Sequence, residues 1–276
     1  MIFKLEEKII IMKLSFIFIV LLTFFMNGCG LLSKKYVKSD KEVHRVSAVG
    51  KKTLLIENIN GNISFVSSSD SGIVKIVAEK EIKVKKKYLN TPFDEITIEI
   101  DSTGNEIKIE SIINNKGRDD GFNFNFDRKQ KVDYEISVPE GISISVENVN
   151  GKISADNISN DLKIDQVNGS VDLDNYSGLL ECDLTNGSFS GVIDSTKGIN
   201  INVINGSVTL NLSNYISARV NAQSENGKIS TDNLKFSDMI QEKKSFKGNL
   251  GTEDNRSEII IKTVNGKIVF TGNKEI

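Results

Sequence analysis

The sequence has no tryptophan, two prolines, two cysteines and a single histidine among its 276 residues. Two cysteines are too few for a scaffold held together by several disulfides. Any Ser-His-Asp catalytic triad would have to use His44, the single histidine. His44 has no neighbouring cysteine, second histidine or carboxylate cluster in the sequence, so we expect a surface residue, no metal site and no cofactor. The net charge of -2, from Lys+Arg 35 against Asp+Glu 37, gives no reason to expect a nucleic-acid partner.

The residues that are abundant point to strands. Asn, Ser, Ile, Val and Gly dominate, and proline is scarce. This composition suits many short strands joined by tight turns, and it is poor for long helices. We therefore predict an all-β protein.

The first residues are typical of a secretory leader. Lys13 precedes an apolar run over residues 14–25, and small residues surround Cys29. The apolar run is shorter than the roughly 20 residues that cross a bilayer, so the pattern favours export over a transmembrane helix. Glu6 and Glu7 are unusual in the positively charged start of a leader, which makes Met12 a candidate for the true first residue.

The segment Met26–Cys29 resembles the lipobox of bacterial lipoproteins, although the usual first leucine is methionine here. The resemblance implies cleavage before Cys29 and attachment of diacylglycerol to it; ordinary cleavage or a structural cysteine are the alternatives. Each buried CH₂ of an acyl chain contributes roughly 0.8 kcal/mol, so several chains form a durable membrane anchor. We predict a signal peptide over residues 1–28, a lipidated Cys29 with a solvated spacer over 29–42, and a β domain over 43–276. Gly30 follows the cysteine, which implies the outer membrane if the cell has two membranes.

Asn-Gly pairs recur along the chain at seven positions: Asn60-Gly61, Asn150-Gly151, Asn168-Gly169, Asn186-Gly187, Asn205-Gly206, Asn226-Gly227 and Asn265-Gly266. The central spacings are 18, 18, 19 and 21 residues. A single Asn-Gly pair is common in hairpins, but a near-constant interval indicates a structural repeat with a turn at each pair.

The flanks of these pairs repeat as well. Ile153, Ala155, Ile158, Leu162 and Ile164 align with Val171, Leu173, Tyr176, Leu180 and Cys182, and the last two align in turn with Ile199 and Ile201 and then with Val220 and Ala222. A rung of about 18 residues cannot offset its own ordering entropy, so neighbouring rungs must stack and share one core. We predict a parallel β-solenoid that turns at the Asn-Gly pairs, where the Asn side chains could also form a ladder. A β-sandwich or meander, with Asn-Gly as hairpin turns, is the alternative.

Three regions depart from the regular repeat. Residues 43–82 read as a first rung, and residues 94–138 read as an antiparallel excursion or cap at the N-terminal end, with a loop over 114–121. Residues 237–257 read as a polar insertion before the final strand pair. End rungs of solenoids are normally atypical because they cover the open core.

The segments IENINGNI, VDYEISVPEGISISVENVNGKI, FKGNLG and IIIKTVNGKIVF occur in this order, and with the repeated Asn-Gly rungs they resemble the DUF4097 group of adhesin-like domains with β-strand repeats. The resemblance spans about residues 45–272. It implies a right-handed β-solenoid, exported to or anchored in the cell envelope, and some members are associated with envelope-stress systems. The family brings no catalytic residues to carry over.

A few residues could carry chemistry. Asp165 and Asp183 lie one 18-residue step apart, so they could act as an acid and base pair on neighbouring rungs, but a solvated face explains them better. Cys182 falls in a core column, which predicts a buried free thiol.

Two segments could contact partners. Lys83, Lys85, Lys86 and Lys87 could meet anionic lipid or envelope phosphates, or could act as lysines that protect an edge strand. Phe122, Phe124 and Phe126 alternate, so they could plug a solenoid end or form an apolar docking patch.

These features together predict a non-enzymatic, lipid-anchored envelope protein that binds a protein or glycan on the envelope or on a host surface. A regulatory sensor of envelope stress is the alternative, and a carbohydrate-active enzyme built on a β-helix is a more distant one.

Overall fold

A computed structural model describes residues 35–86, 89–90, 93, 96–113, 130–252 and 257–272. Within these residues the chain forms 21 β-strands and no α-helix, which confirms the prediction of an all-β protein. No helix long and apolar enough to cross a bilayer occurs in the described part of the chain.

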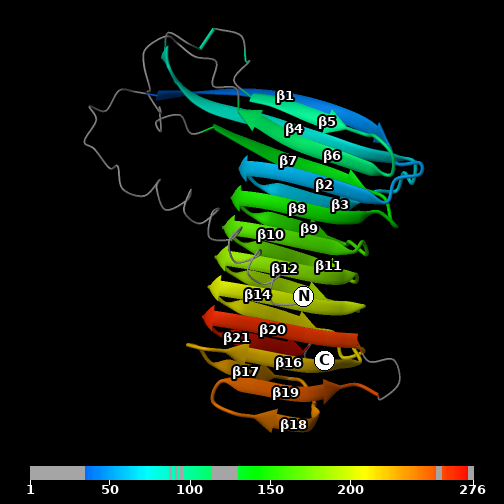
Figure 1. Cartoon of the computed structure of the whole chain (residues 1–276), viewed down its shortest axis with the longest axis vertical. Coiled ribbons are helices and arrows are strands. Elements are labelled where there is room, and N and C mark those ends of the chain that lie inside the picture. The colour runs from blue at the N-terminus through cyan, green and yellow to red at the C-terminus, as the bar shows by residue number, and fades with distance from the viewer. Residues whose placement is uncertain are drawn as a thin grey trace, which may run out of the picture. The chain divides into compact units, whose positions relative to one another are not determined.

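The strands form two large sheets of mostly parallel strands (Figure 1). The first sheet contains, in spatial order, β1 (Lys35–Ser47), β4 (Ile73–Lys85), β7 (Gln130–Val138), β3 (Ile63–Ser67), β9 (Ile153–Asp156), β11 (Val171–Tyr176), β13 (Phe189–Ile193), β15 (Val208–Leu212), β21 (Ile268–Gly272) and β17 (Ile229–Asp232). The second contains β18 (Ser237–Gln241), β19 (Ser245–Leu250), β16 (Ala218–Ser224), β20 (Ser257–Asn265), β14 (Gly198–Asn205), β12 (Leu179–Asn186), β10 (Leu162–Asn168), β8 (Ser143–Asn150), β2 (Thr53–Asn60), β6 (Glu106–Ile113) and β5 (Ile96–Asp101).

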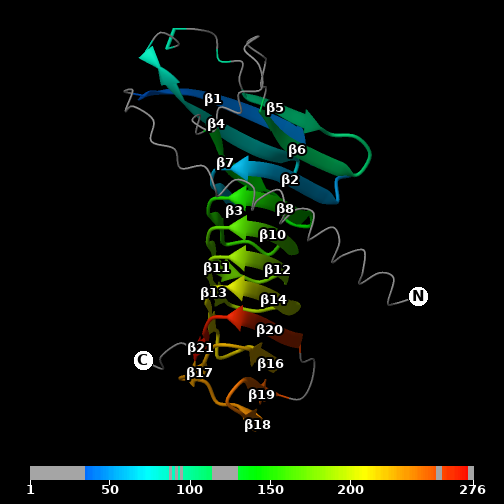
Figure 2. The ribbon, with the colours of Figure 1, turned by 60° about the vertical axis from the view of Figure 1, so that its left-hand side comes forward.

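In the middle of the stack, successive strands alternate between the two sheets, and like positions pair in register (Figure 2). Ile164 pairs with Cys182, and Cys182 pairs with Ile201, in parallel strands. The columns expected from the sequence are therefore confirmed over these rungs. The strands on either side of an Asn-Gly pair, such as β10 and β11, lie in different sheets, so these pairs are not the hairpin turns of the alternative interpretation.

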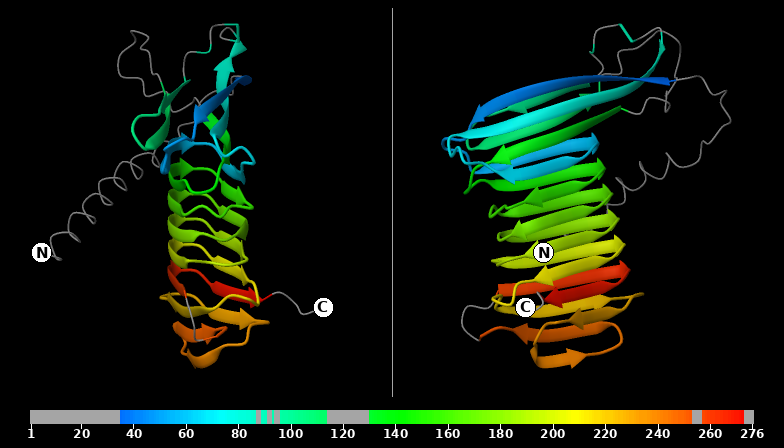
Figure 3. Two further views of the ribbon diagram at one scale, coloured as in Figure 1. Left: turned by 90° about the vertical axis from the view of Figure 1, so that its right-hand side faces the viewer. Right: turned by 180° about the vertical axis from the view of Figure 1, so that it is seen from behind.

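The C-terminal strands break the sequential order of the stack. β20 and β21 lie between β14–β15 and β16–β17, so Ile201 pairs with Ile261, and Ile261 pairs in turn with Ala222 (Figure 3). Val220 and Ala222 lie in the same columns as Ile199 and Ile201, as the alignment predicts, but one strand further along, so the expectation that successive segments stack in chain order is wrong here. The reason is that β20 carries the same apolar alternation as β16, and therefore fits the same column.

The segment expected as a polar insertion over residues 237–257 is also different. Its first part forms β18 and β19, which pair antiparallel with each other and continue the second sheet beyond β16. Phe246 of β19 is fully buried and stacks edge-on against Phe236, with ring centroids 4.8 Å apart. β19 therefore covers the core at this end of the stack, whereas β18 lies at the sheet edge with all its residues exposed.

At the other end, β6 and β7 extend the parallel stack over β2 and β3. Of the described strands within residues 94–138, β5 alone runs antiparallel to its neighbour, β6, so the expected antiparallel excursion is wrong for β6 and β7. β4, expected in the first rung, runs antiparallel to β7, and β4 and β1 extend the first sheet rather than completing that rung. β1 begins at Lys35, so the expectation of a solvated spacer is wrong for residues 35–42. The polar sequence did not indicate a strand, because its carboxylates Asp40 and Glu42 form ion pairs with the buried Lys80 of β4 and not with residues near them in the sequence.

The seven Asn-Gly pairs lie at one corner of the stack. Their side chains form a ladder in the order Asn60, Asn150, Asn168, Asn186, Asn205, Asn265 and Asn226, and from Asn150 onward each amide Nδ2 donates to the Oδ1 of the preceding asparagine at 2.8 to 3.0 Å. The backbone N–H of Gly169 also donates to the carbonyl oxygen of Asn186 at 3.0 Å, and the other central rungs repeat this bond. The asparagines follow one another in the ladder in the same order as the rungs do in the stack. Asn265 of the inserted β20–β21 rung therefore lies between Asn205 and Asn226.

Candidate functional site

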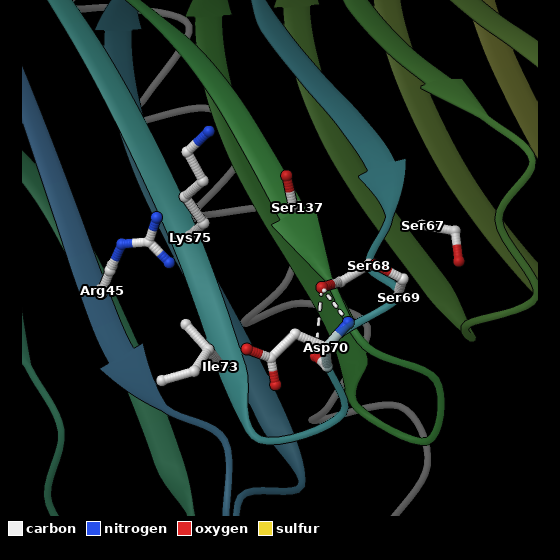
Figure 4. Close-up of a pocket in the computed structure, with 8 residues that line it drawn as sticks. All are labelled: Arg45, Ser67, Ser68, Ser69, Asp70, Ile73, Lys75 and Ser137. Atoms are coloured by element: carbon white, nitrogen blue, oxygen red, sulfur yellow. Dashed lines mark hydrogen bonds between the residues drawn. The ribbon is translucent and has the colours of Figure 1, made fainter.

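A polar cavity of about 220 Å³ lies beside the turn that joins β3 to β4 (Figure 4). Its lining residues are Arg45, Ser67, Ser68, Ser69, Asp70, Ile73, Lys75 and Ser137. Lys75 and Ser137 are register partners on β4 and β7, and their neighbours Ile76 and Ile136 are fully buried. Because side chains alternate along a strand, the cavity opens on the outer face of the first sheet.

The turn that forms the floor of this cavity is held by its own hydrogen bonds. The N–H of Asp70 donates to the hydroxyl of Ser68 at 3.2 Å, and that hydroxyl donates to the carbonyl of Asp70 at 3.1 Å. The N–H of Gly72 donates to one carboxylate oxygen of Asp70 at 2.9 Å. Backbone bonds from Ser68 to Val138 and from Ala48 to Gly72 fix the turn to the flanking strands. The cavity is therefore preformed.

Two cations line the cavity without a carboxylate partner. Arg45 on β1 is exposed and Lys75 on β4 is half-buried, and within the described residues neither forms an ion pair. Other lysines on the same sheet face do form ion pairs. Lys131 Nζ lies 2.7 Å from Asp133 Oδ2, and Lys152 Nζ lies 2.7 Å from Asp172 Oδ2. The cavity thus leaves two positive charges open to a ligand.

A second charged cluster lies on the inner side of β1 and β4. The Lys80 side chain is only 4% exposed, and its ammonium lies 3.0 Å from Asp40 and against Glu42, with the Phe93 ring centroid at 5.2 Å. Burial lowers the pKa of Lys80, but the bonds from Glu42 and Asp40 outweigh it, so the net shift is upward. Burial likewise raises the pKa of Glu42, and the bonds from Lys80 and His44 reverse this to a net lowering. The positive charge of Lys80 is balanced by the carboxylates within the cluster, so the cluster has a structural role.

His44 belongs to this cluster. Its Nε2 lies 3.0 Å from Glu42 Oε2, and the residue is half-buried. From the sequence we expect a surface residue without a carboxylate cluster; the structure places one carboxylate, Glu42, against the half-buried His44 ring. The contact was not predicted because residues 29–42 were expected to form a spacer. Residues 35–42 belong instead to a strand, β1, in which residues two apart lie on one face.

Asp165 and Asp183 are register partners on β10 and β12, as their spacing predicts. The amide of Asn202 donates to Asp183 at 2.9 Å, and Lys163 Nζ lies 3.9 Å from Asp165. The pair is part of a longer row of carboxylates along the second sheet, formed by Glu99, Glu110, Glu57, Glu147, Asp165 and Asp183.

Like charges in register cost stability, and Lys108 offsets part of that cost at 3.0 Å from Glu57 and 3.2 Å from Glu110. Among the residues with described positions, no group of three or more His, Cys, Asp or Glu side chains could hold a metal ion. The acidic row is a charged face of the second sheet.

Cys182 is a free cysteine, 2% exposed in the core, as predicted. Burial raises the pKa of its thiol, and the nearby carboxylates of Asp183 and Asp165 act in the same direction. The thiolate is the reactive form, so this cysteine is poorly suited to nucleophilic or redox chemistry.

Several predicted contact residues lie outside the described part of the chain: Cys29, Phe122, Phe124, Phe126, Lys87 and the side chain of Lys85. Lys83 is half-buried and Lys86 is exposed at the end of β4. The interpretation of these lysines as edge protection is wrong because β4 lies between β1 and β7 in the sheet.

Sequence reasoning missed the cavity entirely. Its residues come from β1, the β3–β4 turn, β4 and β7, which span residues 45 to 137. No motif joins these segments. Only the three consecutive serines before Asp70 stand out, and they indicate no more than a turn.

No family model matches the chain, and no curated protein does. Among solved structures, it is similar to a "putative cell adhesion protein" from Clostridium sporogenes, at 16% identity over 86% of this chain and 100% of that one, with a TM-score of 0.44. It is also similar to a "putative adhesin" from Bacteroides fragilis, at 11% identity over 87% of this chain and 100% of that one, with a TM-score of 0.31. At these TM-scores, the likenesses assign no function to the chain.

Proposed function

We propose that this chain is a lipid-anchored envelope protein that binds a surface ligand and catalyses no reaction, in the manner of an adhesin. The observation that carries the proposal is the preformed polar cavity, which holds two cations without carboxylate partners on the outer face of a stacked sheet. A rigid site with open hydrogen-bonding groups is suited to binding.

The scaffold supports this role. We infer that the stacked rungs form a right-handed β-solenoid of the kind that the DUF4097 resemblance implies. Register pairing at 18- and 19-residue steps places the side chains of the outer faces in rows. A backbone that is already held by the sheet loses little entropy when a ligand binds, which favours affinity.

The leader and Cys29 support the anchor. We propose that a diacylglycerol on Cys29 holds the protein in a bacterial membrane, which would be the outer membrane in a cell with two membranes. Metabolic labelling with a fatty acid tests this directly: the unaltered chain should incorporate the label, and Cys29→Ser should not. Incorporation by both chains, or by neither, would contradict the anchor.

The binding role is tested with the full chain purified in detergent and a panel of envelope and host-surface glycans. We expect saturable binding with no change in the length of the glycan chains. Degradation of a glycan that is abolished by Asp165→Asn together with Asp183→Asn would replace the proposal with an enzymatic function. Crosslinking in intact cells that captures mainly a membrane regulator would replace it with a sensor function.

A further inference from the structure

The charge and size of the cavity define a ligand class, and this inference rests on the proposed binding function. Arg45 and Lys75 contribute two positive charges, and Asp70 contributes the only negative charge of the lining. A carboxylate therefore leaves the occupied cavity neutral, and a sugar phosphate, which carries about −1.5 to −2 charges at pH 7, leaves it slightly negative. The volume of about 220 Å³ lies below the roughly 300 Å³ at which pockets for drug-sized ligands begin, so it suits one small unit of a larger molecule.

The two cations are placed to hold an anion. In Figure 4 the guanidinium of Arg45 points from β1 toward β4, and the Lys75 side chain extends from β4 in the direction away from Asp70. Ser137 of β7 is the register partner of Lys75. A guanidinium binds carboxylate and phosphate through two parallel hydrogen bonds, and a lysine ammonium adds a point charge. The hydroxyl of Ser137, directly across from Lys75 in the strand register, can donate to the same group.

The rest of the lining is suited to hydroxyl groups. One carboxylate oxygen of Asp70 accepts the N–H of Gly72, which leaves the other oxygen to accept from a ligand hydroxyl. Ser69 is exposed at the rim, and Ile73 provides a short apolar wall beside the polar groups. A site of this kind presents acceptors for hydroxyls next to donors for an anion.

We propose that this cavity binds an acidic sugar, that is, one sugar ring that carries a carboxylate or a phosphate. The anionic group lies between Arg45 and Lys75, and the ring hydroxyls face Asp70 and the serines. The shared chemistry is one anionic group on a polyhydroxylated ring, which a uronic acid or a phosphorylated sugar of an envelope or host glycan would supply.

Three probes with the same ring separate the sources: glucuronate, glucose 6-phosphate and glucose. They differ only in the group at the sixth carbon. Ligand-observed NMR with the full chain in detergent should give saturable binding for glucuronate or glucose 6-phosphate, with a dissociation constant on the order of 1 mM for so small a ligand. The stronger of the two identifies the anion. Glucose should bind at least about tenfold more weakly, because it lacks the charge-assisted bonds.

Two variants test the cations, and one serves as a control. Arg45→Gln and Lys75→Gln should each weaken binding of the acidic sugar about tenfold. Lys152→Gln removes a lysine that reaches the same sheet face but pairs with Asp172 outside the cavity, and it should bind as the unaltered chain does. Far-UV circular dichroism and the melting temperature of each variant should match those of the unaltered chain, because Arg45 is exposed and neither cation is part of an ion pair within the described residues.

Binding of glucose as strong as that of both glucuronate and glucose 6-phosphate, or undiminished binding by both cavity variants, would overturn the proposed ligand class. The binding function is judged separately on the glycan panel. If Arg45→Gln and Lys75→Gln keep the binding of the unaltered chain to the panel, the ligand lies elsewhere and only the present inference fails. If the unaltered chain binds no glycan and none of the three probes, both proposals fail.

Discussion

Substitution of Gly169 by alanine tests why glycine follows asparagine at every rung. A Cβ on Gly169 would lie 2.7 Å from the carbonyl carbon of Gly151 on the neighbouring rung, and closer still to its oxygen. The same overlap with the glycine of the adjacent rung occurs at Gly187 and Gly206. The glycines are therefore required by the close approach of stacked backbones, in addition to their positive φ.

The magnitude follows from two costs. Gly169 has a φ of +139°, and an alanine there is strained by about 1 to 2 kcal/mol. Relief of the overlap must separate the rungs locally, which costs about 1 to 3 kcal/mol and weakens the Gly169 N–H bond to Asn186. We expect Gly169→Ala to lower the free energy of unfolding by about 2 to 5 kcal/mol.

Gly141 provides a matched control, because it has a φ of +84° and no atom within 4 Å of an added Cβ. Gly141→Ala should cost only the backbone strain, about 1 to 2 kcal/mol. Urea denaturation followed by far-UV circular dichroism measures both variants against the unaltered chain. A loss at Gly169 no larger than the loss at Gly141 would refute the argument from rung contact.

Three further predictions concern single side chains. Asn168→Ala removes two ladder bonds, from Asn168 to Asn150 and from Asn186 to Asn168, and should lower the free energy of unfolding by about 1 to 3 kcal/mol; an unchanged urea midpoint would contradict a stabilising ladder. The pKa of Glu42 is lowered in the folded chain, so its contribution to stability is present above its ordinary pKa of 4.5 and is lost as the pH falls below it. Glu42→Gln should therefore reduce the dependence of the melting temperature on pH between about pH 5 and pH 3, and an identical pH profile would contradict the ion pair with Lys80. Cys182 should react with a thiol reagent only after unfolding, and rapid modification of the native chain would show that its burial is wrong.

The sequence predicted the repeat because each rung must satisfy the same local conditions. Apolar residues alternate toward the core, and Asn-Gly occupies the corner at each level, so the periodicity is visible without coordinates. The positions of Ile164, Cys182 and Ile201 in one column follow from this pattern alone.

The order of the rungs at both ends could not be predicted in the same way. β20 and β16 present equivalent alternating faces, so either could pair with β14, and only the whole fold decides between them. The polar sequence of β1 concealed a strand because its inward carboxylates are matched by Lys80, which lies about forty residues away. The cavity depends on the same long-range arrangement, since β1, β4 and β7 must lie side by side before Arg45, Lys75 and Ser137 can face one space.

Disulfide trapping across the inserted rung tests the central claim, that chain segments stack with like positions in register and with β20 between β14 and β16. Asn202 pairs with Lys262, and Lys262 pairs in turn with Gln223. In a chain with Cys29 and Cys182 replaced by alanine, Asn202→Cys with Lys262→Cys should form a disulfide under mild oxidation, because neighbouring strands lie about 4.8 Å apart. Asn202→Cys with Gln223→Cys should not, because two strand spacings exceed the roughly 7 Å that a disulfide can bridge. Efficient crosslinking of the second pair, without crosslinking of the first, would contradict the stack described here.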